Sequence, residues 1–307
     1  MRDTCVDLLT PAIGKSESPV VVDATLGLGG HSEALLDSNP NLVLIGIDRD
    51  LDAIVKAKNR LAKFENRVKL NHAIFDEITD VVNSFGFEQV DGILFDLGVS
   101  SMQLDQSDRG FSYSQDAPLD MRMDRSTGIT ASEIINTYAP GELVRILRTY
   151  GEEKFATRIV ENIVKERAKA PLNSTAQLAT LVKESIPAAT RRTGGNPAKR
   201  TFQALRIETN DELGAVNRAI PQALELLKVG GRLVVMSFQS LEDRIVKEVF
   251  AEASTSKSPR NLPIELPEYA AKFSLVFRSS ETPTAEELES NPRSASVRLR
   301  AIERVAA

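Results

Sequence analysis

Segments rich in valine, isoleucine and leucine recur along the chain at strand length. The first has three valines in a row with no polar alternation, which is typical of a strand buried on both faces of a sheet. Between the second and the third of these apolar segments, the stretch Leu51–Phe64 places its apolar residues on one helical face. The pattern predicts an α/β protein with an open, mostly parallel sheet. The five predicted strands are Val20–Val22, Leu42–Ile47, Val68–Ala73, Asp91–Leu97 and Arg232–Phe238.

A long insertion separates the fourth predicted strand from the fifth. Gly98 to Gly231 spans 134 residues, far more than one crossover helix needs. The amphipathic stretch Asp211–Lys228 is enough for the crossover, and Pro221 is expected to kink or split it. The turn Val229–Gly231 should precede the fifth strand. We therefore expect a discontinuous domain, residues 1–103 and 206–307, with an inserted helical subdomain at residues 104–205.

Two helices are predicted within the insertion, over Glu152–Ala168 and Ser174–Ile186. The second has a suitable N-cap at Asn173 or Ser174. Near the end of the chain, Val297–Ile302 alternates apolar residues with arginine, as a half-exposed antiparallel strand does.

Composition narrows the class of protein. The 307 residues are 42% hydrophobic and 26% charged, as in a soluble globular protein. One cysteine and two histidines exclude an internal disulfide framework, a thiolate metal cluster and a multi-histidine metal site. No apolar stretch reaches the length of a membrane span and no signal peptide is visible, so a cytoplasmic location is expected. A net charge of −5 argues against non-specific nucleic-acid binding, although a local basic face could still bind RNA.

A glycine-rich turn, D-A-T-L-G-L-G-G, joins the first strand to a helix expected to open at His31. Its glycines, Gly27, Gly29 and Gly30, allow a tight turn and close approach of a ligand. Asp48 follows 21 residues after Gly27 at the end of the next strand, where an acidic residue binds ribose hydroxyls. An ordinary strand-to-helix connection would explain the glycines but not this spacing. We therefore expect a ribose-bearing cofactor, and Ser32 makes the fit to a dinucleotide fingerprint imperfect.

Three further clusters are candidates for chemistry. Asp96 ends the fourth strand, where ligands of open α/β sheets bind. From Asp91 to Asp124 there are seven aspartates and two arginines, interleaved with Phe111, Met121 and Met123. This segment is either a solvated loop or a loop that holds a polar planar ring between apolar faces.

The third cluster is basic. Residues 186–206 hold five basic side chains and no acidic one, in a loop-like segment that contains G-G-N-P. Such a loop suggests phosphate contacts, and the plainer alternative is a solubilising surface loop. The candidate RNA-binding residues are Arg191, Arg192, Lys199 and Arg200.

Several stretches of the sequence, which include the glycine-rich turn, the end of the fourth strand and the acidic segment, resemble the RsmH/MraW family. Members of this family are S-adenosylmethionine-dependent methyltransferases of small-subunit ribosomal RNA. The resemblance covers the chain from about Thr4 to Arg304 and includes D-A-T-L-G-L-G-G-H, D-G-I-L-F-D-L-G-V-S-S-x-Q-L-D, R-G-F-S, P-L-D-M-R-M-D, Y-G-E-E-K-F-A, R-T-F-Q-A-L-R-I, S-L-E-D-R-I-V-K and N-P-R-S. It implies a class I methyltransferase fold (Rossmann-like, with a mostly parallel sheet) and N4-methylation of a cytidine, cytosine 1402, in the decoding region of 16S rRNA within the small subunit.

The resemblance also implies which residues bind S-adenosylmethionine. Gly29, Gly30 and His31 match the family's methionine-side turn, and Asp48 matches its ribose-binding acid. Phe75 matches the residue near the adenine, while Asp96 and Gln103 match two further cofactor contacts. Gln239 stands where the family has a histidine.

The chemistry suggests catalytic roles as hypotheses. The cytosine N4 amine is a poor nucleophile, so the enzyme must align it and accept its hydrogen bonds. We expect Asp120 to bind the amine, Asp96 to bridge cofactor and base, and Arg122 to hold the base O2 or a phosphate. Phe111 or Met123 could support the unstacked base.

Other functions remain open. They are a methyltransferase acting on another RNA, a non-catalytic RNA-binding assembly factor and a dinucleotide oxidoreductase. The sequence also leaves open whether the protein is a homodimer.

Overall fold

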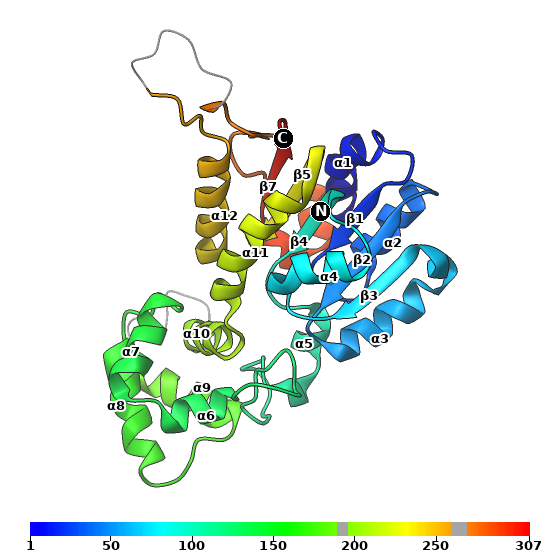
Figure 1. Cartoon of the computed structure of the whole chain (residues 1–307). Helices are drawn as coiled ribbons and strands as arrows, with labels where there is room; N and C mark the ends of the chain where they lie inside the picture. The colour runs from blue at the N-terminus through cyan, green and yellow to red at the C-terminus, as the bar shows by residue number, and fades with distance from the viewer. Residues whose placement is uncertain (189–195, 260–268) are drawn as a thin grey trace. The chain divides into compact units, whose positions relative to one another are not determined.

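The computed structural model describes residues 1–188, 196–259 and 269–307, and it divides into two compact units (Figure 1). Unit 1 consists of Met1–Gly98 and Leu213–Ala307, and unit 2 is Val99–Glu212. The boundaries lie a few residues outside the predicted insertion, residues 104–205.

Unit 1 is built on a seven-stranded sheet of order β3-β2-β1-β4-β5-β7-β6, to which both the blue N-terminal and the yellow-to-red C-terminal parts of the chain contribute (Figure 1). The first five strands are parallel, and β7 and β6 are antiparallel. The predicted α/β class and parallel sheet are therefore confirmed. The strands are β1 Val20–Asp23, β2 Val43–Asp48, β3 Val68–His72, β4 Val90–Asp96, β5 Leu227–Ser237, β6 Phe273–Leu275 and β7 Arg298–Arg304.

Helices cover both faces of this sheet, which explains why its central strands are continuously apolar. One apolar cluster joins the sheet to α4, α11 and α12, and the other joins it to α1, α2 and α3. The helices of unit 1 are α1 Arg2–Ile13, α2 Gly30–Ser38, α3 Leu51–Arg60, α4 Ile78–Ser84, α11 Glu212–Leu226, α12 Ser240–Ala253 and α13 Ala285–Ser290.

Of the kink or split expected at Pro221, the split is wrong, because α11 continues through this residue. Proline removes one backbone N–H and leaves the carbonyl four residues earlier without its helical partner. Pro221 lies on the exposed face of α11, where water can bond that carbonyl, while Ala219, Ile220 and Ala223 are fully buried. Packing of the buried face therefore keeps the helix in one piece.

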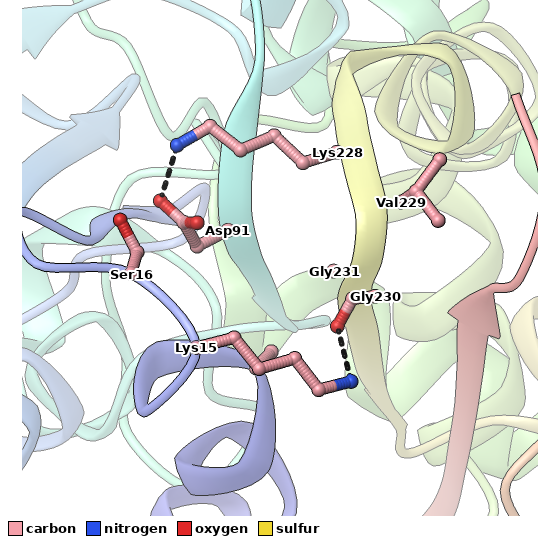
Figure 2. Close-up of a pocket in the computed structure, with 8 residues that line it drawn as sticks. Lys15, Ser16, Asp91, Lys228, Val229, Gly230 and Gly231 are labelled. Atoms are coloured by element: carbon pink, nitrogen blue, oxygen red, sulfur yellow. Dashed lines mark hydrogen bonds and ion pairs between the residues drawn. The ribbon is translucent and has the colours of Figure 1, made fainter.

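The turn predicted at Val229–Gly231 is also wrong, because these residues lie inside β5 (Figure 2). The pairing with β4 is irregular here, and Gly230 has φ +83°. The Lys15 side chain covers Gly230, with Nζ 3.5 Å from its carbonyl oxygen, and Lys228 Nζ bonds Asp91 Oδ2 at 2.8 Å. A bulge thus lengthens the strand where the sequence suggested a turn.

A small pocket of about 200 Å³ lies beside this bulge (Figure 2). Lys15 and Lys228 line it, but each is paired with a carboxylate, Lys15 with Glu303 at 3.1 Å and Lys228 with Asp91. Its positive charge is therefore already neutralised within the protein.

Unit 2 is helical and has an apolar core of its own. The second predicted helix is confirmed with Ser174 as N-cap, and the first begins at Ala156 rather than Glu152. Among the helices of both units that the structure describes, none is long and apolar enough to cross a membrane. The helices of unit 2 are α5 Ser101–Asp105, α6 Ala131–Thr137, α7 Pro140–Thr149, α8 Ala156–Arg167, α9 Thr175–Ser185 and α10 Lys199–Asn210.

Two glycines of unit 2 provide a matched test of its packing. A Cβ at Gly151 would lie 2.6 Å from the Arg200 carbonyl oxygen and 2.8 Å from that of Leu147, whereas a Cβ at Gly141 in α7 would meet no atom within 4 Å. We expect Gly151→Ala to lower the free energy of unfolding by about 1–3 kcal/mol. Gly141→Ala should raise it by up to about 1 kcal/mol through helix propensity. Urea unfolding of both variants checks this, and equal stabilities would contradict the packing described here.

Candidate functional site

Three neighbouring strands of unit 1 end in aspartate at the same edge of the sheet. Asp48 ends β2, Asp23 ends β1 and Asp96 ends β4, and these strands are adjacent in the order β2-β1-β4. Adjacent strands are about 4.8 Å apart, so the sheet edge carries a row of carboxyl groups. We call these residues the aspartate row.

The Asp48 carboxylate holds the glycine-rich turn in place. Its Oδ2 accepts from the Gly27 N–H at 2.7 Å, and its Oδ1 accepts from the Asp50 N–H at 2.8 Å. Gly27 and Gly29 have φ of +50° and +74°, and α2 begins directly afterwards at Gly30. Because a carboxylate has about four acceptor positions, Asp48 keeps capacity for ribose hydroxyls, as the spacing predicts.

Asp23 is buried, and Ser32 explains how this burial is tolerated. The Ser32 hydroxyl donates to Asp23 Oδ2 at 2.7 Å, and the Thr25 N–H donates to Oδ1 at 3.3 Å. Burial nevertheless raises the pKa of Asp23 to about 6. The serine that departs from the dinucleotide fingerprint therefore has a defined structural role.

Asp96 and His31 leave polar atoms without partners. Burial, with Asp23 and Glu242 nearby, raises the pKa of Asp96 to about 7. Burial lowers the pKa of His31 to about 4, so the imidazole is neutral at pH 7 although its Nδ1 lies 3.8 Å from Asp96 Oδ2. Asp96 Oδ1 and His31 Nε2 are buried and accept or donate no hydrogen bond within the described residues. Among the described residues, no lysine or arginine side chain forms an ion pair with the carboxyl groups of this edge, which favours a ligand bearing a positive charge.

Phe75 and Gln103, suggested only by resemblance, have different surroundings. Phe75 begins a 3₁₀ turn after β3 and packs edge-to-face on Phe95, with ring centroids 5.6 Å apart. Gln103, in unit 2, belongs to a capping box: its Oε1 accepts from the Ser100 N–H, and its own N–H donates to the Ser100 hydroxyl. This gives Gln103 a helix-capping role, and its cofactor contact stays a prediction.

Asp120 and Arg122 form a bidentate ion pair in unit 2. Arg122 Nε lies 2.8 Å from Asp120 Oδ1 and Nη2 lies 3.0 Å from Oδ2, while the Arg122 N–H also donates to Oδ1. Partial burial alone would raise the pKa of Asp120, but these hydrogen bonds hold it below its ordinary value. Asp120 is therefore an ionised acceptor at neutral pH, and its Oδ2 keeps an acceptor position.

The apolar residues of this segment are packed inside unit 2. Phe111, Met121 and Met123 are at most 7% exposed and belong to the core of unit 2. The interpretation that Phe111 or Met123 supports an unstacked base is therefore wrong.

The basic segment is only in part a loop. Lys199 and Arg200 form the first turn of α10, and the Arg200 guanidinium donates to the Glu152 carbonyl oxygen. Arg206 forms a bidentate pair with Glu212 at 2.7 and 2.8 Å and is structural. Arg191 and Arg192 lie outside the described residues.

Titration of Asp96 gives a testable pH dependence. Since its pKa in the folded protein is raised to about 7, the folded state retains a proton that the unfolded state has lost. The ligand-free protein should therefore lose stability as pH rises from about 4 to 7. Binding of a cationic ligand should weaken as pH falls through 7, because Asp96 becomes neutral.

Replacing Asp96 with asparagine should reduce both pH effects while leaving the fold intact, and the raised pKa values of Asp23 and Asp48 should account for what remains. Thermal unfolding and cofactor titration between pH 5 and 8 check this. An unchanged pH profile in Asp96→Asn would show that another group is responsible.

Comparisons with known proteins show to which family the chain belongs. Residues 1–305 match the family model described as the MraW methylase family. The chain is 56% identical to ribosomal RNA small subunit methyltransferase H of Salinispora tropica, over 99% of this chain and 83% of that protein. It is also 56% identical to the protein of the same name from Saccharopolyspora erythraea, over 99% and 92%. An rRNA methylase structure from Streptococcus thermophilus aligns with TM-score 0.44 at 12% identity, covering 98% of this chain and 95% of that one. The chain belongs to the MraW methylase family.

Proposed function

We propose that this protein transfers a methyl group from S-adenosylmethionine to N4 of a cytidine in 16S rRNA of the small ribosomal subunit. Relatives more than half identical over nearly the whole chain are named ribosomal RNA small subunit methyltransferase H. The observation that carries the proposal is the aspartate row, which adjoins a glycine-rich turn and, among the described residues, forms no ion pair with a lysine or arginine. A cofactor that carries both a positive charge and a ribose would fit this edge, because Asp48 can bind the ribose hydroxyls and the other carboxyl groups can face the charge.

The residues present at the edge fit S-adenosylmethionine. Asp48 would bind the ribose hydroxyls, Gly29 and Gly30 would allow close approach of the chain, and Phe75 would pack near the adenine. His31 and Asp96 each have a buried polar atom without a hydrogen-bond partner, and they would face the positively charged sulfur of the cofactor. When bound, the cofactor supplies a methyl group activated by a positively charged sulfur.

The chain's cysteine argues for direct transfer to an amine rather than to a ring carbon. Attack of a thiolate on the base would be needed to activate a cytosine carbon, and the only cysteine is Cys5. Cys5 is 1% exposed, its thiol contacts Met236 Sδ at 3.7 Å, and burial raises its pKa. Such a thiol is inert, so transfer to C5 of cytosine is disfavoured, whereas transfer to the exocyclic N4 amine needs no thiolate.

Asp120 would accept a hydrogen bond from the cytosine amine through its remaining Oδ2 position. This bond aligns the amine and keeps electron density on nitrogen as the new bond forms. Because its pKa is lowered, Asp120 acts as an electrostatic acceptor, and the proton leaves to water after transfer. Arg122 also donates to the carbonyl oxygens of Thr127 and Gly128, at 3.3 and 3.5 Å. We therefore propose that Arg122 orients Asp120, and not that it binds the base O2 or a phosphate as expected from the sequence.

Basic residues of unit 2 would bind the RNA backbone. Lys199 and Arg200 are exposed at the start of α10, and Arg191 and Arg192 precede them in the sequence. Since the protein as a whole carries net charge −5, these contacts should be local and sensitive to salt. The enzyme would act in the cytoplasm, as a monomer or a homodimer, and sedimentation would distinguish the two.

Methyl transfer from labelled S-adenosylmethionine tests this function. We expect label to enter small subunits that lack the modification and to be absent from subunits that already carry it. Cofactor binding without transfer to any RNA would favour an assembly factor. Binding of a nicotinamide dinucleotide in place of S-adenosylmethionine would favour an oxidoreductase.

A further inference from the structure

The segment that carries Asp120 and Arg122 has no regular secondary structure, yet its backbone is fully bonded within unit 2. Each N–H and each carbonyl of Leu119–Met123 has a hydrogen-bond partner. Loops usually leave such groups to water. This one is therefore held as firmly as a strand, and we call it the Asp120 loop.

Two buried side chains supply the bonds at its centre. Asn210, 3% exposed, donates from Nδ2 to the Met121 carbonyl oxygen and accepts the Met123 N–H at Oδ1, both at 2.8 Å. Arg109, 2% exposed, donates from Nη2 to the carbonyl oxygens of Arg122 and Met123, at 3.2 and 2.8 Å. The Arg109 carbonyl oxygen in turn accepts the Met121 N–H at 3.0 Å.

The loop is strained where these bonds meet. Met121 has φ +63°, in the left-handed region that side chains other than glycine rarely adopt. The neighbouring Gly110 packs against the start of the loop, because a Cβ there would lie 2.3 Å from the Pro118 carbonyl oxygen and 2.9 Å from the Asp120 nitrogen. Strain of this kind persists only where the surroundings enforce it, and it is concentrated at functional sites.

We infer that Asn210 and Arg109 are positioning residues that fix the Asp120–Arg122 pair for methyl transfer. The left-handed Met121 lets Asp120 and Arg122, two residues apart, face each other, and the two buried side chains keep Met121 in that conformation. The pair itself is part-exposed, at 13% for Asp120 and 21% for Arg122, and so can meet a substrate. This inference rests on the proposed role of Asp120.

The test replaces Asn210 and measures transfer at saturating cofactor and RNA. We expect Asn210→Ala to lower kcat by about 10- to 100-fold, because small displacements of a catalytic group have effects of this size. KM for S-adenosylmethionine should stay within about twofold, since the residues proposed to bind it are mainly in unit 1, whereas Asn210 bonds the Asp120 loop of unit 2.

A double-mutant cycle with Asp120→Asn separates positioning from general weakening. If Asn210 acts through Asp120, the double variant should be no more than about threefold slower than Asp120→Asn alone. If the kcat of the double variant instead fell by the product of the two single-variant losses, the inference would be overturned. A fully active Asp120→Asn variant would instead refute the proposed function of Asp120, whatever Asn210 does.

Asn136 provides the matched control. Its amide makes the same two-way tie to another loop, donating to the Leu172 carbonyl oxygen and accepting the Leu172 N–H, both at 3.0 Å, and it bonds no residue of the Asp120 loop. Asn136→Ala should lower the melting temperature but leave kcat within about twofold. An equal loss of kcat in both alanine variants at matched stability would overturn the inference.

Discussion

Asp120→Asn should lower kcat for methyl transfer by about 100- to 1,000-fold, the effect typical of removing one preorganised electrostatic contact. Asparagine keeps the size of the side chain but loses the charge that Arg122 orients. The asparagine amide also presents either its oxygen or its nitrogen to the incoming amine, and only the oxygen can accept a hydrogen bond from that amine. The measurement is single-turnover transfer to small subunits at saturating cofactor.

The cofactor affinity of this variant should be unchanged within about twofold, because Asp120 belongs to unit 2, whereas Asp48, the proposed ribose-binding acid, and the glycine-rich turn belong to unit 1. Asp108→Asn is the control, since Asp108 lies in the same acidic segment and makes an exposed ion pair with Arg125 at 3.1 Å. It should transfer at the wild-type rate. Equal loss of affinity and rate in Asp120→Asn would contradict the role assigned to Asp120.

Asp48→Ala should weaken cofactor binding by about 10- to 100-fold, since hydrogen bonds to a charged group contribute roughly 1.5–3 kcal/mol. The substitution removes the proposed ribose acceptor and also releases the N–H groups of Gly27 and Asp50. Calorimetric titration with S-adenosylmethionine measures the change. At saturating cofactor, kcat should recover to a large part of its wild-type value.

Asp50→Ala distinguishes loss of ribose binding from loosening of the fold. Asp50 caps α3 by accepting the Asp52 N–H at 3.1 Å, and losing a cap costs about 1 kcal/mol. We expect a less stable protein with nearly wild-type cofactor affinity. If Asp50→Ala weakened binding as much as Asp48→Ala, Asp48 would have no specific role.

The sequence predicted the sheet edge well because its signals are local. Apolar runs that end in Asp48 and Asp96, and glycines directly after β1, depend on neighbours in the chain. By contrast, β6 has three residues and no recognisable pattern. The unbroken helix through Pro221 depends on packing against the sheet, which local propensity does not contain.

The substrate side was predicted less completely, because its geometry depends on distant contacts. Asp120 and Arg122 stand out as a charged motif, but their bidentate pairing requires the left-handed Met121. Asn210 bonds the Asp120 loop from 87 and 89 positions away, and no spacing rule links such residues. Phe111 and Met123 were misinterpreted because apolar residues within an acidic segment look exposed until the core of unit 2 is assembled.

The identity of the methylated nucleoside tests the account most directly. After transfer to small subunits that lack the modification, the RNA is digested and the labelled nucleoside is identified by mass spectrometry and chromatography. We expect N4-methylcytidine at one site. Label on C5 of cytidine, on another base or on ribosomal protein would contradict transfer to an amine held by Asp120.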